Sequence, residues 1–273
     1  MVELLYSVTV LTFACKSQTL PPPINDETYA YIGRKRMTTT LCDASTWLGE
    51  TAQLDVSDAK LRITAQKLTQ SKQSHAARAA AIQDFVRRMP FAASADRSAV
   101  RASQVLRAGG GDCHSKGVLF TALCRAAELP ARLLFVNVRP RFLTGILSGG
   151  PTSMLHAVGQ VQVDNRWHST DGYVVDPILF ARAKQLLRAA GSDCGWGIVA
   201  NASGYWNGQT DCLQQFHPQD VLETYGVFND PAEFYRTRRD RPEQGWLLAL
   251  KYELGARMVN LRVAQARHAA HSS

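Results

Sequence analysis

The sequence predicts an α+β fold, in which several helices come first and antiparallel strands follow. Between positions 57 and 130, apolar side chains recur at the three- and four-residue spacing of amphipathic helices. Residues 132–138 and 155–171 are instead rich in β-branched and aromatic residues, and a short polar turn interrupts the second stretch. Of the 273 residues, 45% are hydrophobic and 20% are charged, so the chain can bury a full core.

We expect a single domain over residues 1–273, because no repeat or low-complexity tract divides the chain. Its catalytic core is expected at about 57–178 and contains the candidate catalytic residues described below. Residues 1–56 are expected to form an N-terminal strand and loops. Residues 179–273 are expected to form a mainly helical C-terminal extension.

Four helices are expected in the core, each bounded by capping residues, glycine or proline. The first helix begins at Ser57–Asp58, the second covers about 75–88, and the third covers 98–108. The fourth runs from Cys113 towards Pro130. A strand at 132–138 follows, and residues 139–154 then form a long connection that leads to His156. This connection is either a wall of the site or a simple surface excursion.

The C-terminal extension is expected to contain a helix at 178–190, an aromatic loop around Trp206, and loosely helical residues at 219–235. The aromatic residues of the loop either floor a binding cleft or pack in the core. A long helix ends the chain. Its apolar stripe is typical of a core face and consists of Leu247, Leu250, Leu254, Met258 and Leu261.

The net charge of +8 has two interpretations. It is either an ordinary basic surface or a field that attracts an acidic partner, such as a carrier protein or an acidic substrate. A nucleic-acid partner is disfavoured, because the one dense basic cluster, 236–241, contains no aromatic residue on which bases could stack.

The six cysteines, at 15, 42, 113, 124, 194 and 212, form no Cys-x-x-Cys pair, so no metal site is expected. Cys194 and Cys212 flank one loop and could pair, although free thiols in a reducing, cytoplasmic compartment are the simpler expectation. No basic residue precedes the apolar residues 4–13, which favours a strand over a signal peptide. No transmembrane run follows, and no membrane partner is expected.

Cys113 is the candidate nucleophile, because it lies in the first turn of a core helix after three glycines, Gly109–Gly111. Unpaired N–H groups and the positive end of the helix dipole favour a thiolate there. Cys124 is expected to be a small buried hydrophobe. His114 is expected to point about 100° around the helix, away from Cys113. No Gly-Lys-Ser/Thr follows the glycines, so neither a nucleotide nor another cofactor is expected.

Residues 155–163 and 166–171 predict a β-hairpin whose two-residue turn is either Asp164–Asn165 or Asn165–Arg166. In both cases, even-numbered positions of the first strand share a face with odd-numbered positions of the second. His156 and Asp171 therefore fall on one face, close enough for the carboxylate to orient the imidazole, and His168 falls on the other. Cysteine, histidine and aspartate are the general components of an activated thiol.

These motifs resemble the transglutaminase-like superfamily of papain-like thiol enzymes. The resemblance rests on Gly-Asp-Cys at 111–113, Leu-Pro-Ala-Arg at 129–132, His-Ala at 156–157 and Trp-x-x-x-Asp at 167–171, and covers roughly 57–178. It implies a transglutaminase-like or papain-like fold, with the nucleophile helix packed against an antiparallel sheet. It also makes Cys113 the nucleophile, His156 the acid/base and Asp171 the orienting residue. The family often has tryptophan where this chain has Val158, a departure that bears on substrate contacts.

The predicted activity is formation of an acyl-enzyme on Cys113 from a peptide, an amide or an acyl thioester. The acyl group then passes to an amine or to water, and the sequence leaves amide-bond formation and peptidase or amidase activity open. An acidic carrier protein is kept as a possible acyl donor. Substrate contacts are assigned to Arg139, Arg141 and Trp206. The alternative is a non-catalytic binding protein with the same fold.

Overall fold

The computed structural model describes residues 44–94, 100–147, 151–237 and 246–268, without the side chains of 44, 246–252 and 268. These residues belong to one compact unit. The strand predicted at 4–13, Cys15 and Cys42 lie outside the described residues. Within the described ranges, no helix is both long enough and apolar enough to cross a membrane.

Helices α2 to α5 come first among the main elements, as the sequence predicts, and the strands of the central sheet follow them. The α-helices are α2 (Ala59–Thr69), α3 (His75–Arg88), α4 (Ala102–Ala108), α5 (Cys113–Ala126), α6 (Pro177–Ala190), α7 (Pro231–Thr237) and α8 (Trp246–His268). Short 3₁₀ helices are η1 (Ala44–Trp47), η2 (Arg141–Leu143) and η3 (Pro218–Asp220). The strands are β1 (Ala131–Val138), β2 (Met154–Val163), β3 (Arg166–Thr170), β4 (Cys194–Gly195), β5 (Ile198–Val199) and β6 (Val221–Phe228).

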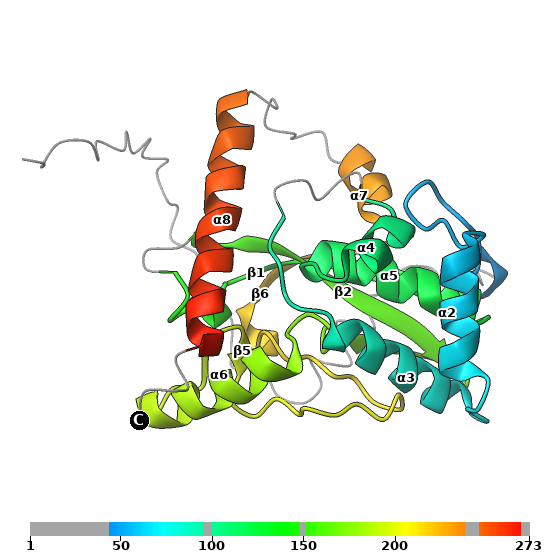
Figure 1. Ribbon diagram of the computed structural model, residues 1–273, viewed down its shortest axis with the longest axis horizontal. Coiled ribbons are helices and arrows are strands. Elements are labelled where there is room, and N and C mark those ends of the chain that lie inside the picture. Colours follow the sequence, from blue (N-terminus) through cyan, green and yellow to red (C-terminus); the bar gives the residue numbers. More distant parts are fainter. Residues whose placement is uncertain (1–43, 95–99, 148–150, 238–245, 269–273) are drawn as a thin grey trace, which may run out of the picture. The chain divides into compact units, whose positions relative to one another are not determined.

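The central sheet has the strand order β3-β2-β1-β6, and every neighbouring pair is antiparallel. Helix α5 packs against β1 and β2, and α2, α3 and α4 pack around α5 (Figure 1). The predicted α+β fold, with the Cys113 helix against an antiparallel sheet, is therefore confirmed.

Small and apolar side chains let α5 approach the sheet closely. Leu133 and Phe135 of β1 and Ala157 of β2 are fully buried. Gly159 of β2 lies under Phe120 of α5, and a Cβ atom at this position would come within 2.7 Å of the Phe120 ring. The close packing at this point fixes the helix relative to β2, and therefore fixes Cys113 relative to the strand that carries His156.

The turn between β2 and β3 consists of Asp164 and Asn165, because Val163 pairs with Arg166. Both turn residues have positive φ values, 49° and 63°, as a type I′ turn requires. Of the two turns that the sequence left open, the structure therefore has Asp164–Asn165. It also gives the predicted parity, since Gln160 pairs with Ser169 and Gln162 pairs with Trp167.

The prediction that residues 219–235 are loosely helical is wrong for most of this segment. Residues Val221–Phe228 form β6, which pairs antiparallel with β1, and helix α7 begins only at Pro231. β6 is an edge strand with mostly half-exposed or exposed side chains, so the alternation that marks a half-buried strand is weak. The fourth strand of the central sheet thus comes from the C-terminal extension.

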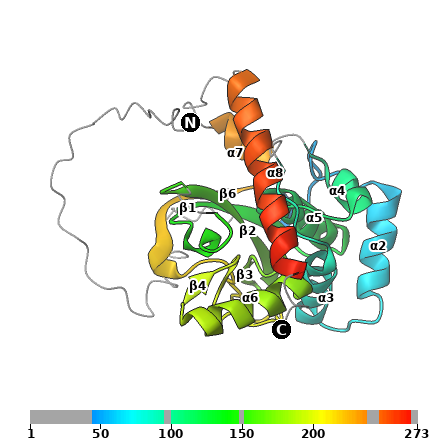
Figure 2. The ribbon, with the colours of Figure 1, turned by 60° about the vertical axis from the view of Figure 1, so that its left-hand side comes forward.

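The prediction that the α8 stripe is a core face is also wrong where side chains are described. Leu254, Met258 and Leu261 are 55%, 54% and 61% exposed. Helix α8 lies against α6 (Figure 2), with Val263 buried. The side chain of Asn260 also exchanges two hydrogen bonds with the backbone of Ala93, at 2.7 and 3.0 Å, so polar contacts hold a helix whose apolar stripe faces outwards.

Replacing Gly159 by alanine should destabilise the protein by about 1–3 kcal/mol, because the new methyl group overlaps the Phe120 ring. The free energy of unfolding in urea measures this. Gly255→Ala is the matched control, since Gly255 lies in α8 with open space around it, and alanine there should stabilise the helix by up to about 1 kcal/mol. Equal stability of Gly159→Ala and the wild type would contradict the close contact.

Candidate active site

The first turn of α5 is fixed by its N-cap, Asp112. Its Oδ1 accepts hydrogen bonds from the backbone N–H groups of His114 and Ser115, both at 3.0 Å. The Ser115 hydroxyl in turn accepts from the Asp112 N–H at 2.8 Å, which completes a capping box. Among the described residues, no acceptor takes the Cys113 N–H, and this donor lies beside the Cys113 sulfur at the positive end of the helix.

His156 and Asp171 come together as the hairpin parity predicts. His156 lies on β2, Asp171 follows the last residue of β3, and both side chains are almost completely buried. The His156 Nε2 lies 3.3 Å from the Asp171 Oδ2. This is the distance of an ion pair, although the N–H is not aligned for a well-directed hydrogen bond.

The Asp171 carboxylate is held by backbone donors from a distant segment. The Gln214 N–H donates to Oδ1 at 2.6 Å, and the Gln215 N–H donates to Oδ2 at 3.3 Å. This segment is tied to β3 because the Cys212 N–H donates to the Ser169 carbonyl at 2.8 Å. The sequence reasoning missed Gln214 and Gln215, since their contribution is made by the backbone and leaves no signal in residue type.

Charge interactions favour a thiolate at Cys113. Burial alone would raise the pKa of the Cys113 thiol, but the imidazoles of His114 and His156 outweigh it and hold the pKa well below its ordinary value. Burial alone would lower the pKa of His156, but Cys113 and Asp171 outweigh it and raise the pKa to about 10. Both shifts favour a thiolate–imidazolium pair over a neutral thiol and a neutral imidazole.

The three other described cysteines have raised pKa values, in contrast to Cys113. All are free and buried. Burial raises the pKa of Cys124 far above its ordinary value, that of Cys194 to about 12 and that of Cys212 to about 11. Cys124 is the small buried hydrophobe that the sequence predicts, and Cys194 and Cys212 are not bonded to each other. No group of three or more His, Cys, Asp or Glu residues in the described part of the chain could hold a metal ion.

The expectation that His114 points away from Cys113 is wrong. Its Nδ1 lies 3.3 Å from the Cys113 sulfur, and the ring is buried. The angular separation of neighbouring residues on a helix describes their Cβ positions only. Because side chains lean towards the helix N-terminus, the longer His114 side chain reaches back to the sulfur.

Two aromatic rings enclose His156. Phe142 of η2 lies at a ring-centroid distance of 6.1 Å, and Phe216 lies at 5.2 Å in an edge-on arrangement. Phe142 belongs to the 139–154 connection, so part of this connection is a wall of the site rather than a simple surface excursion. The sequence assigned neither ring to the site. Both are buried and limit access of water to the imidazole.

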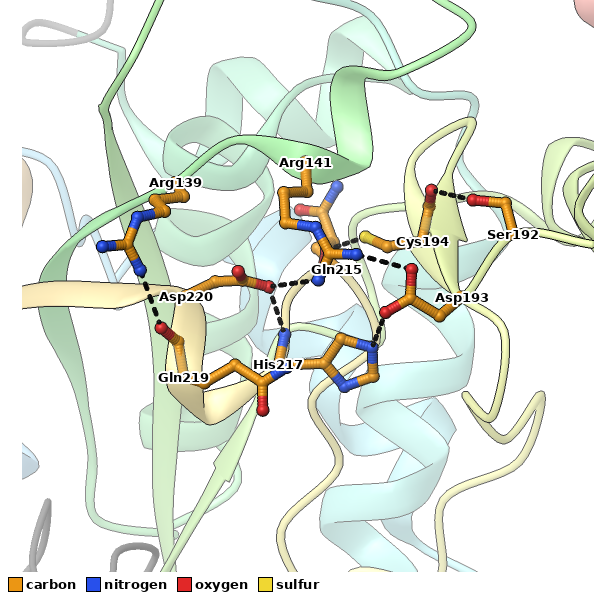
Figure 3. A network of polar contacts seen from close by, with 9 residues as sticks. All are labelled: Arg139, Arg141, Ser192, Asp193, Cys194, Gln215, His217, Gln219 and Asp220. Carbon is orange, nitrogen blue, oxygen red and sulfur yellow. Dashed lines mark hydrogen bonds and ion pairs between the residues drawn. The ribbon is translucent and has the colours of Figure 1, made fainter. Parts of the chain in front are cut away.

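The connection beside Phe142 is secured by ion pairs (Figure 3). Arg141 lies 2.5 Å from Asp193 and 3.8 Å from Asp220, and the hydrogen bond that its guanidinium donates to Asp193 raises the pKa of Arg141. Its charge is thus balanced within the protein, and a substrate contact of Arg141 stays a prediction. Arg139 is exposed and donates to the Gln219 carbonyl at 3.2 Å. A substrate role of Arg139 stays a prediction.

Trp206 is a core residue and does not floor an open cleft. Its side chain is buried, belongs to the main hydrophobic core, and donates its indole N–H to the Thr210 carbonyl at 2.6 Å. Of the two interpretations that the sequence left open for this aromatic side chain, core packing is the one observed.

Comparison with known proteins gives one family match. Residues 62–172 match the family described as the transglutaminase-like superfamily, and no curated protein matches the chain. The chain is similar to a candidate cysteine protease from Cytophaga hutchinsonii, with 20% identity, 50% of this chain and 44% of that chain covered, and a TM-score of 0.41. It is also similar to a candidate protease from Parabacteroides distasonis, with 15% identity, 47% and 26% covered, and a TM-score of 0.33. The chain thus spans less than half the length of either structure.

The fold and the site define a protein in which a helix N-terminus presents a cysteine to a histidine–aspartate pair on an antiparallel hairpin. The resemblance predicted from the sequence is confirmed to the extent that residues 62–172 match the transglutaminase-like superfamily. The matched segment contains Cys113, His156 and Asp171. Strand β6, the segment around Gln214 and helix α8 lie outside it.

Iodoacetamide at neutral pH should alkylate Cys113 at least about ten times faster than Cys124, Cys194 or Cys212, because the thiolate is the reactive form. Peptide mapping by mass spectrometry measures the rate at each cysteine. In Cys113→Ala, labelling of the peptide that contains position 113 should disappear. Similar rates at all four cysteines would show that the imidazoles do not ionise the Cys113 thiol.

Proposed function

We propose that the protein is a cysteine acyltransferase or hydrolase that carries its acyl group as a thioester on Cys113. The observation that supports this most is the buried site itself, in which the Asp171 carboxylate lies 3.3 Å from Nε2 of His156. The pKa shifts of Cys113 and His156 favour a thiolate–imidazolium pair in this site. A purely structural cysteine has no use for such an arrangement, since burial without charge partners makes a thiol inert, as at Cys124.

In the first half-reaction, the Cys113 sulfur attacks the carbonyl carbon of an amide or thioester. The N–H of Cys113 at the start of α5 donates to the oxygen on which negative charge develops. The bond from carbon to the leaving nitrogen or sulfur then breaks, and the His156 imidazolium gives its proton to the leaving group. The products are the free amine or thiol and an acyl-enzyme.

In the second half-reaction, neutral His156 takes a proton from the incoming amine or water, which attacks the thioester and releases the Cys113 sulfur as a thiolate. Since Nε2 faces Asp171, Nδ1 is the nitrogen left to exchange protons with substrate and sulfur. The negative charge of Asp171 stabilises the imidazolium in both halves, which is the role of the third member of a catalytic triad.

We place transfer to an amine ahead of hydrolysis. His156 is fully buried between Phe142 and Phe216, and Cys113 is 8% exposed. A site that excludes water slows hydrolysis of the acyl-enzyme and gives a bound amine the advantage. The ratio of amide to free acid formed from a small acyl thioester, with and without added amines, decides between the two.

Cys113→Ala and His156→Ala should each reduce thiol release from a small acyl thioester to background, and Asp171→Asn should reduce it by about 10²–10⁴-fold. His168→Ala is the control, because His168 lies on the other face of the hairpin, opposite Val161, and should retain full activity. Circular dichroism would verify folding. If Cys113→Ala kept the activity of the wild type, the non-catalytic binding protein would be the better interpretation.

An acidic carrier protein stays a proposed acyl donor, and Arg139 is the residue that tests it. Arg139→Ala should lower the rate of Cys113 acylation by a carrier-borne thioester by about threefold at low salt, because one unbalanced surface charge contributes to steering. Acylation by an uncharged thioester should not change. A carrier rate that depends on neither Arg139 nor ionic strength would contradict the carrier as donor.

A further inference from the structure

His114 contacts the proposed nucleophile from its own helix. It is 1% exposed, and its Nδ1 lies 3.3 Å from the Cys113 sulfur, which is within hydrogen-bonding range for sulfur. The sulfur thus has a second imidazole beside it, in addition to His156. The triad chemistry described above makes no use of this second ring.

Three elements hold the His114 ring in place. Its backbone N–H is bound by Asp112, at the start of α5. Its ring stacks on Tyr235 of α7, with an angle of 14° between the rings and a centroid distance of 6.4 Å. Phe135 of β1 lies at a centroid distance of 5.7 Å on a tilted plane. The ring therefore cannot turn away from the sulfur without disturbing the packing of α7 and β1.

The surroundings of His114 decide which nitrogen carries its proton. Its Nε2 is buried and has no hydrogen-bond partner among the described residues. A proton on Nε2 would be an unsatisfied buried donor, whereas an unpaired acceptor at this position costs less. A proton on Nδ1 faces the sulfur and can donate to it. The arrangement that fits this site therefore has a proton on Nδ1, which faces the sulfur.

We propose that His114 is a positioning residue of the nucleophile, which donates a hydrogen bond from Nδ1 to the Cys113 thiolate and holds the sulfur beside His156. This role rests on the proposed function, in which Cys113 is the nucleophile. It separates two tasks: His156 moves protons, and His114 holds the negative sulfur in place whenever His156 has given its proton to the leaving group.

The donated hydrogen bond has an effect on reactivity that simple packing does not have. It increases the fraction of thiolate at low pH, but it also makes each thiolate a weaker nucleophile. Removing it should raise the midpoint of the pH–rate profile for alkylation and, at the same time, raise the limiting rate at high pH. If the substitution instead only disturbed the packing around Cys113, the limiting rate at high pH would fall.

Other titratable groups on the elements packed around Cys113 and His114 remain present in the His114 variants. They include the N-cap carboxylate, the buried lysine one turn along α5, the proposed acid/base, its carboxylate, a buried phenol and the phenol that stacks on His114: Asp112, Lys116, His156, Asp171, Tyr173 and Tyr235. A shift of the midpoint in a His114 variant therefore reports the lost imidazole, provided that these groups keep their places.

The experiment measures the rate constant for alkylation of Cys113 by iodoacetamide between about pH 4 and pH 10, a range that spans ordinary thiol ionisation. His114→Phe keeps the stacking on Tyr235 but removes the donor. It should raise the midpoint by about one pH unit and the limiting rate by about threefold. His114→Asn should restore most of the wild-type profile, because its amide nitrogen can donate from nearly the position of Nδ1. His168→Phe is the control and should leave the profile unchanged.

The proposal is overturned if His114→Phe leaves the midpoint where it is, or if the limiting rate falls and His114→Asn does not restore it. If His114→Phe does not fold, His114→Leu takes its place, with the same criteria. His156→Phe distinguishes this failure from failure of the proposed function. If His156→Phe shifts the midpoint and His114→Phe does not, only the positioning role of His114 is wrong. If neither variant shifts the midpoint, the proposal that Cys113 is an activated nucleophile is wrong.

Discussion

The site depends on the burial of one carboxylate, that of Asp171. A carboxylate with no exposed surface is stable only when donors replace the water that it has lost. Here the donors are the backbone N–H groups of Gln214 and Gln215, and His156 lies 3.3 Å away as an ion-pair partner. The chain after β5 must therefore return to the end of β3, and it does so through the Cys212–Ser169 hydrogen bond. Residues beyond the family-matched core thus supply the hydrogen bonds that stabilise a buried carboxylate within it.

A buried amine ties the nucleophile helix to the same region. Lys116, one turn after Cys113, is fully buried, and its Nζ donates to the carbonyls of Met89 at 2.6 Å and Val174 at 3.0 Å. Burial lowers its pKa to about 7. The two carbonyls belong to the end of α3 and to the segment three residues beyond Asp171. Lys116 therefore connects the start of α5 with the chain that carries the carboxylate, which keeps the distance between Cys113 and its partners fixed.

The parts of the fold that the sequence predicted are those set by local patterns. The Cys113 helix, bounded by glycines and Pro130, and the parity that brings His156 to Asp171 both follow from spacing alone. Strand β6 was missed because an edge strand gains its stability from pairing with β1, a partner far away in the sequence. The contact of His114 with sulfur was missed for another reason, since it depends on a side-chain rotamer and not on the helical position.

The aromatic enclosure of His156 gives Arg141 a role other than substrate binding. Phe142 directly follows Arg141, and the ion pairs of Arg141 with Asp193 and Asp220 fix this stretch of the 139–154 connection (Figure 3). Coulombic attraction between a thiolate and an imidazolium weakens as the local dielectric constant rises. Water beside His156 would therefore weaken the pair that ionises Cys113. By fixing the segment that carries Phe142, an ion-pair network at the surface helps to keep the buried pair dry.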